Sequence, residues 1–227
     1  MTRRLSYTDY PRSILWLIPG GSVELDGQVV EIEPFYLSKW PITNEQLSAF
    51  DAAYQPAAVS PGPRDVAVAV DWDQAHAYCR WYAEVARKPM RLPTEAEWLH
   101  ACRGGGDGGG DSSATTTGGA AVEGAGLHGI GGLDPRLGAD FGRINGFGLH
   151  GMTGGVWEWV VAATEAAGHG SAGAAPAAEP ADGARVLRGG SFRIAEAELS
   201  CRLRRVVDRT WRADDVGFRV AKSLRLG

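Results

Sequence analysis

Apolar residues in the first part of the chain come in short runs that are broken by turn residues. Ile14–Ile18 is closed by a Pro-Gly-Gly turn, and Asp26-Gly27 separates Val23–Leu25 from Gln28–Ile32. Asp-Gly between two such runs is a strong hairpin signal because these residues tolerate positive φ angles. The pattern predicts short strands joined by tight turns. Similar runs predict further strands at Phe35–Leu37, Val66–Val70 and Arg185–Leu187, and a hairpin-like region that ends at Gly217–Ala221.

Three other segments carry apolar residues at helical spacing, and each begins with a capping signal. Thr43-Asn-Glu-Gln46 and Thr94-Glu-Ala-Glu97 have the spacing of capping boxes, in which two side chains satisfy free backbone N–H groups. Asp71-Trp-Asp-Gln74 is a looser version of the same signal. We expect helices from these three caps to about Ala53, Cys102 and Ala86, respectively.

Two low-complexity stretches interrupt this pattern. Glycine dominates 104–119, and alanine, glycine and proline dominate 162–184. No strand precedes the first stretch and no lysine follows it, so a flexible insert is favoured over a phosphate-binding loop. We therefore expect a single domain over 14–222 that carries both inserts, after a frayed N-terminus at 1–13.

Charge and hydropathy narrow the classes of partner. A net charge of −4 and a pI near 5.7 argue against a nucleic-acid-binding or membrane-binding protein. No apolar run approaches the roughly 20 residues that a membrane span needs. Ile14–Ile18 is followed by no small-residue cleavage site, so we identify no signal peptide and expect a cytoplasmic location.

The chain contains three cysteines, Cys79, Cys102 and Cys201. They are too few and too scattered for a disulfide framework or a zinc knuckle. A single disulfide is still possible if the fold brings two of these cysteines together, but we expect all three to be reduced. Cys79 lies on the apolar stripe of the helix that begins at Asp71, which favours a buried core role.

The stretch Gly148–Trp159 combines glycines, two tryptophans and a carboxylate. This composition predicts a tight, irregular loop in preference to a regular strand, with the indoles anchoring the loop in the core. Glu158 lies between the tryptophans. A buried carboxylate needs a cation, an arginine or several N–H donors, so Glu158 is expected to have such a partner.

Four segments of the sequence together resemble the formylglycine-generating enzyme (sulfatase-modifying factor) superfamily. The resemblance spans about Ile18 to Ala221. It implies an α+β domain of C-type-lectin-like fold, with short helices, short twisted strands and much irregular loop; fold alone does not fix activity. The segments are Arg91-Leu-Pro-Thr-Glu-Ala-Glu-Trp98, Gly148–Trp159, Arg188-Gly-Gly-Ser-Phe192 and Gly217-Phe-Arg219.

The resemblance bears directly on copper chemistry. In the sulfatase-activating members, two cysteines after the Gly-Gly-Ser turn bind copper and support oxidation of a substrate cysteine to formylglycine. Soft thiolates suit copper(I), but after Ser191 this chain has only Cys201. We therefore expect neither copper nor formylglycine generation. By analogy with the family, Ser191 and Cys201 lie near the pocket floor, and together with His150 they are the candidate catalytic residues.

The resemblance also implies a calcium site in the loop before the Trp-Glu-Trp segment. The carbonyls of Gly154 and Val156 and the carboxylate of Glu158 match the family's oxygen ligands, which suit calcium. The remaining side-chain ligand falls on Gly151, which has no side chain to offer. The alternative is an ion pair between Glu158 and an arginine such as Arg188 or Arg219. Both readings remain open.

The segment from Glu196 to Asp215 is densely charged, and the resemblance places it on the ligand-binding face. Forked guanidinium groups beside a tryptophan suit a carboxylate, a phosphate or a planar heterocycle. A solvated face of mutually compensating charges is the alternative. The candidate ligand-binding residues are Arg188, Arg202, Arg204, Arg205 and Trp211.

Two functions from different classes are compatible with the sequence. The first is a module that binds a small anionic or planar ligand or a protein partner. The second is an oxygen-using tailoring enzyme in natural-product or sulfur metabolism. The absence of a cysteine pair and of closely spaced histidines favours the first, because neither copper nor iron has a visible ligand set. The histidines are His76, His100, His128, His150 and His169.

Overall fold

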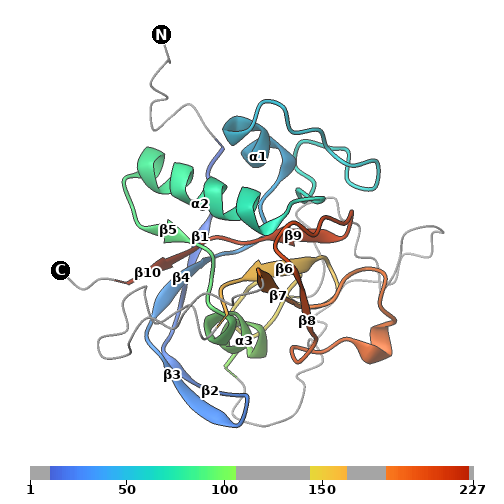
Figure 1. Cartoon of the computed structure of the whole chain (residues 1–227). Helices are drawn as coiled ribbons and strands as arrows, with labels where there is room; N and C mark the ends of the chain where they lie inside the picture. Colours follow the sequence, from blue (N-terminus) through green and yellow to red (C-terminus); the bar gives the residue numbers. More distant parts are fainter. Residues whose placement is uncertain (1–10, 106–143, 163–182, 225–227) are drawn as a thin grey trace.

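The computed structural model describes residues 11–105, 144–162 and 183–224 (Figure 1). Most of the two low-complexity inserts and of the N-terminal segment lie outside the described residues. The helices are α1 (Asn44–Phe50), α2 (Trp72–Ala86), α3 (Glu95–Arg103) and the short 3-10 helix η1 (Glu196–Glu198). The strands are β1 (Leu15–Ile18), β2 (Gly21–Leu25), β3 (Gln28–Ile32), β4 (Phe35–Ser38), β5 (Met90–Arg91), β6 (Trp157–Val160), β7 (Ala184–Arg188), β8 (Arg204–Asp208), β9 (Val216–Phe218) and β10 (Ala221–Ser223).

Within the described ranges the strands form three sheets, and together with the helices they confirm the α+β class. One four-stranded sheet has the order β1-β4-β10-β5, a second has the order β8-β7-β6-β9, and β2 and β3 form a separate hairpin. Every pairing is antiparallel except that of β6 with β9, which is parallel. The C-terminal strands therefore serve both larger sheets, β9 in one and β10 in the other.

The β2–β3 hairpin confirms the turn predicted at Asp26-Gly27. Leu25 pairs with Gln28, so the loop has two residues. Asp26 and Gly27 have φ angles of 52° and 76°, both in the left-handed region. A two-residue hairpin whose central residues both have positive φ is the type I′ turn that Asp-Gly favours.

The helix caps agree with their sequence signals, in two cases fully. Thr43 and Thr94 each form a reciprocal capping box at the start of α1 and α3. The Asp71 carboxylate accepts from the Gln74 backbone N–H, but the Gln74 side chain donates to Asp51 instead of returning to the cap. This cap is therefore one-sided, and the reciprocal bond of a capping box is missing here.

Helix α1 ends at Phe50, earlier than the predicted end near Ala53. Asp51 is extended, with a φ of −120° and a ψ of 97°. Its carboxylate accepts from the Ala53 N–H at 3.0 Å, and its carbonyl accepts from the Tyr54 N–H at 3.0 Å. An aspartate that bonds to the backbone two residues on favours a turn over continued helix, and this ends α1 early.

Helices α2 and α3 lie on opposite sides of the sheet that contains β6 and β7 (Figure 1). Trp159 and Leu187 belong to the core cluster that includes the buried face of α2. Val160 and Val186 belong to the cluster that includes Trp98 of α3. Because both faces of the sheet are covered, the β6 side chains are buried whichever face they point to.

Two strand predictions are wrong. Val66–Val70 forms only an isolated bridge, between Val66 and Thr43, because Ala69 has a φ of 58° that interrupts the extended backbone. Conversely, the Trp157–Val160 part of the predicted irregular loop is a regular strand in which all four residues are buried. Strands β5 and β8 were not predicted either, since neither shows a clear apolar alternation.

Candidate functional site

An ion pair between Glu158 of β6 and Arg219 lies at the centre of the fold. The Arg219 Nε donates to both oxygens of Glu158, at 2.8 and 2.9 Å, and the Trp98 Nε1 donates to one of them at 2.8 Å. Both charged residues are fully buried. The sequence left Arg188 and Arg219 as possible partners for Glu158, and in the structure the partner is Arg219.

The remaining donors of Arg219 tie three segments together. Its Nη1 donates to the carbonyls of Ser38, at 3.1 Å, and Lys39, at 3.0 Å, and its Nη2 donates to the carbonyl of His150. Burial raises the pKa of Glu158 and lowers that of Arg219, and the attraction between the two charges opposes both shifts. The pair therefore acts as a cross-link between β4, the glycine-rich loop and β6.

These residues do not fit a calcium ion well. Calcium binds carboxylate and carbonyl oxygens, but both oxygens of Glu158 already accept hydrogen bonds from Arg219 and Trp98. A calcium ion at this carboxylate would lie close to a buried guanidinium, and two cations repel each other strongly at low dielectric. The Glu158 carboxylate is thus explained by its ion pair with Arg219, and the calcium site at the carbonyls of Gly154 and Val156 and at Glu158 stays a prediction.

His150 and Ser191, the other candidate catalytic residues, are buried and engaged. The His150 ring packs against Trp40 with the ring centroids 5.0 Å apart. The Ser191 hydroxyl donates to Asp215 at 2.7 Å. His150 lies in the loop before β6, and Ser191 lies in the turn after β7.

The Gly189-Gly190 turn needs glycine for a steric reason. Gly189 has a φ of 99°, and a Cβ there would lie 2.9 Å from the Met152 carbonyl and 3.0 Å from the Trp98 ring. Gly189→Ala is expected to lower the free energy of unfolding by about 1–3 kcal/mol beyond the backbone strain alone. Gly27→Ala is the control, since Gly27 also has positive φ but a Cβ there meets nothing. Equal shifts of the two variants in thermal unfolding would contradict the steric reason.

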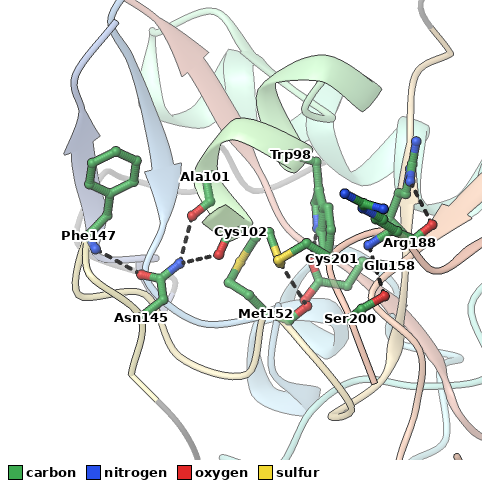
Figure 2. Close-up of a disulfide and its surroundings, with 11 residues drawn as sticks. Trp98, Ala101, Cys102, Asn145, Phe147, Met152, Glu158, Arg188, Ser200 and Cys201 are labelled. Carbon is green, nitrogen blue, oxygen red and sulfur yellow. Dashed lines mark hydrogen bonds between the residues drawn. A yellow bond between two sulfur atoms is a disulfide. The ribbon is translucent and has the colours of Figure 1, made fainter. Parts of the chain in front are cut away.

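A disulfide joins Cys102, in the last turn of α3, to Cys201, which precedes β8 (Figure 2). The expectation that all cysteines are reduced is therefore wrong for this pair. Cys79 is free and buried, as predicted, and burial raises the pKa of its thiol. In this oxidised state Cys201 has no thiolate to act as a nucleophile or a metal ligand.

Close to the disulfide, hydrogen bonds from a side chain also hold the end of α3. The Asn145 side-chain amide donates to the carbonyls of Ala101, at 2.6 Å, and Cys102, at 3.3 Å (Figure 2). Carbonyls of the last turn lack the N–H partner of a regular α-helix, and the Ala101 carbonyl also accepts from the Gly104 N–H at 3.3 Å. The end of α3 is thus held by both a covalent bond and a side-chain cap.

Two of the five candidate ligand-binding residues share one buried acid. Arg188 is only 3% exposed, and its Nη2 lies 2.5 Å from Glu95. Arg204 Nε donates to the same carboxylate oxygen at 2.6 Å. Burial lowers the pKa of Arg188, and Glu95 opposes this shift, whereas the hydrogen bond to Glu95 raises the pKa of Arg204. Of these two arginines, Arg188 is therefore a core residue, whereas Arg204 reaches the surface.

Most other arginines in this part of the chain also have an acidic partner. Arg202 and Arg205 are the exceptions: among the described residues, neither guanidinium has one. The Arg205 guanidinium lies 4.7 Å from the centre of the buried Trp157 ring. Trp211, on the loop after β8, is 44% exposed. The paired arginines are Arg193 with Asp214, Arg209 with Asp73 and Arg212 with Asp71.

The described residues hold no group of three or more His, Cys, Asp or Glu side chains that could bind a metal ion. His76 stacks on Trp72, and the His100 Nε2 lies 2.9 Å from the Pro19 carbonyl. His128 and His169 lie outside the described residues. Across the same described ranges, none of the helices has the length and apolarity needed to cross a lipid bilayer.

Sequence reasoning missed the roles of Glu95 and Cys102. Glu95 directly follows the cap residue Thr94, and its position in the first helical turn explained its charge without any partner. In the structure Glu95 is buried, with an exposure of 1%, and it binds two arginines. These are Arg188 and Arg204, which are remote from it in sequence. No local signal in the sequence indicated this cluster.

Comparison with known families gives a match over almost the whole chain. The model of the "Sulfatase-modifying factor enzyme 1-like domain" matches residues 7–224. The match contains all the segments that carried the resemblance in the sequence.

Curated relatives include active and inactive proteins. A formylglycine-generating enzyme of Thermomonospora curvata is 32% identical over 200 residues, which cover 76% of this chain and 62% of that protein. The inactive Cα-formylglycine-generating enzyme 2 of Mus musculus is 32% identical over 191 residues, which cover 74% of this chain and 54% of that protein. The chain thus spans less than two thirds of the length of either relative.

Solved structures support the same fold. The structure of PvdO from Pseudomonas aeruginosa superimposes with a TM-score of 0.67 at 23% identity, covering 92% of this chain and 94% of that one. At this identity the likeness speaks for the fold alone, and it agrees with the lectin-like α+β architecture expected from the sequence.

Proposed function

The chain belongs to the sulfatase-modifying factor enzyme 1-like family, and we propose that it is a binding module of that family without formylglycine-generating activity. In this proposal, the exposed segment Arg202–Asp208 and the neighbouring Trp211 hold an anionic ligand or partner.

The proposed lack of formylglycine-generating activity rests on the cysteines. Beyond Ser191 the sequence has only Cys201, and this residue is bonded to Cys102. A two-thiolate copper site needs a second free cysteine close by. The remaining thiol, Cys79, is buried in the core next to α2.

One observation carries the proposed binding role. Five arginines lie between Glu196 and Asp215, and three of them have acidic partners, whereas Arg202 and Arg205 have none among the described residues. Both are exposed. Arg205 is also held over the Trp157 ring, which orders its guanidinium before a ligand arrives. Unneutralised, ordered guanidinium groups favour carboxylates and phosphates, which accept paired hydrogen bonds.

Removal of these two charges tests the proposal. We expect the double variant Arg202→Gln/Arg205→Gln to bind citrate, pyrophosphate and a fluorescein-labelled hexaglutamate peptide at least about tenfold more weakly than the parent protein, because charge-assisted hydrogen bonds are lost. Calorimetry and fluorescence anisotropy measure these affinities. The affinities should also fall with added salt.

Arg193→Gln/Arg209→Gln is the matched control for this experiment. It removes the same charge from the same region, but both arginines already have acidic partners, so its affinity should stay close to that of the parent. Equal losses in the two double variants would mean that net charge alone is sensed. If the parent protein binds none of the three anions, the proposal is wrong.

Metal content separates this proposal from the alternative of an oxygen-using tailoring enzyme. Mass spectrometry of protein purified without chelator is expected to find neither copper nor iron in stoichiometric amounts, since the described residues offer no metal-ligand cluster. Stoichiometric copper or iron would overturn the binding proposal and favour the enzyme.

A further inference from the structure

Among the described residues, the outer strand of the C-terminal sheet, β8, has one edge that no other strand pairs with. The sheet has the order β8-β7-β6-β9, so β8 pairs with β7 on one side, and no other described strand pairs with it. At the opposite edge of the sheet, the Phe218 carbonyl of β9 already accepts from the Ile42 N–H at 2.9 Å. Within the part of the chain that the structure describes, the backbone of β8 therefore has an edge to which a further strand can be added.

The register shows which backbone groups of β8 are unpaired. The Arg209 N–H donates to the Gly183 carbonyl at 3.0 Å, which makes these residues a hydrogen-bonded pair. In an antiparallel ladder such pairs alternate along the strands, so Arg205 and Val207 direct their backbone groups to β7. The N–H and C=O groups of Arg204 and Val206 therefore point away from the sheet.

This edge lacks most of the features that prevent strand addition. The register of β7 and β8 runs through five pairs without a bulge, and β8 contains no proline. Val206 is 52% exposed. Positive charge is a protective feature, and it comes mainly from Arg205, because Arg204 is paired with Glu95. Like charges repel a second copy of the same edge, whereas an acidic strand is attracted to it.

We propose that β8 binds an extended acidic peptide segment of a partner protein by strand addition. This inference rests on the proposed binding function and assigns its partner. The peptide pairs its backbone with the outward N–H and C=O groups of Arg204 and Val206. Its acidic side chains face Arg205 on one side of the sheet and the outer part of Arg204 on the other. Backbone bonds give affinity and the arginines select the acidic sequence.

The probe is a short fluorescein-labelled peptide in which glutamate alternates with threonine, measured by fluorescence anisotropy. We expect the parent protein to bind it and to bind the lysine-threonine analogue at least about tenfold more weakly, through the charge of the edge. A glutamate-threonine peptide with N-methyl groups on alternate residues keeps its charge but loses backbone donors. It should also bind at least about tenfold more weakly.

The matched variants are Val206→Pro and Val206→Thr. Proline at 206 removes an N–H that points away from β7, so the internal ladder keeps its bonds. Val206→Pro is expected to weaken peptide binding about tenfold, and Val206→Thr, which keeps the N–H, is expected to bind normally. Hydrogen exchange gives a direct reading, since the amides of Arg204 and Val206 should become protected only when the peptide is bound.

The outcomes separate this inference from the proposed function. Normal binding by Val206→Pro and by the N-methylated peptide, with loss in Arg202→Gln/Arg205→Gln, would overturn strand addition but leave the anion-binding function. Binding of citrate or pyrophosphate without binding of the glutamate-threonine peptide would do the same. Normal binding by the arginine double variant would overturn both. If Val206→Pro does not fold, the N-methylated peptide and hydrogen exchange still decide.

Discussion

Replacement of Arg219 by methionine is expected to lower the free energy of unfolding by about 3–5 kcal/mol, the usual cost of breaking a buried ion pair from one side. Methionine fills much of the same space but leaves the Glu158 charge buried with only Trp98 as a donor. It also deprives the carbonyls of Ser38, Lys39 and His150 of their guanidinium donor. Chemical denaturation measures the loss.

Arg193→Met is the control for this prediction. The Arg193–Asp214 pair has a similar distance, 2.7 Å against 2.8 Å, but its side chains are 51% and 44% exposed. Its loss should cost less than about 1 kcal/mol. Equal effects of Arg219→Met and Arg193→Met would show that burial of the ion pair is unimportant. If Arg219→Met does not fold, Glu158→Gln and Asp214→Asn provide the same comparison from the acidic side.

Removal of the Cys102–Cys201 disulfide is expected to lower stability by about 2–5 kcal/mol, because the bond closes a loop of 99 residues in the unfolded chain. For a domain of this size the melting temperature should fall by roughly 5–15 °C. The change is the double substitution Cys102→Ser/Cys201→Ser. Differential scanning calorimetry measures the shift.

Reductant is the control for the disulfide prediction. The parent protein in reductant should melt near the double variant, and reductant should not change the variant. Thiol labelling of the unfolded parent protein should find one free cysteine without reductant and three with it. Three free thiols without reductant would mean that the bond does not form. A cytoplasmic location remains a prediction, and the oxidised state of this pair makes it worth testing directly.

Local signals determined the parts of the fold that depend on neighbouring residues. Thr43 and Thr94 begin α1 and α3 because a capping box satisfies backbone groups within four residues. Asp26-Gly27 fixes the β2–β3 hairpin because both residues adopt positive φ. The resemblance of four segments to a known family predicted the lectin-like architecture, which the structure confirms.

The character of β6 was decided by the tertiary structure. Glycines before Trp157 and the carboxylate of Glu158 favoured an irregular loop in the local sequence. The segment is a strand because β7 and β9 pair with it on both sides, and because α2 and α3 cover both faces of their sheet. A strand buried on both faces shows no alternation of apolar and polar residues, so its sequence lacks the usual signal.

Some features of the candidate site were likewise predicted from the sequence, and others were decided by the tertiary structure. From the sequence alone came the expectation that Glu158 needs a partner, that Cys79 lies in the core and that the arginines after Ser191 are candidates for binding. Only the tertiary structure selected Arg219, which is 61 residues from Glu158, and joined Cys102 to Cys201. It also decided which arginines keep an unneutralised charge. These choices depend on distances between residues remote in sequence, which local spacing does not encode.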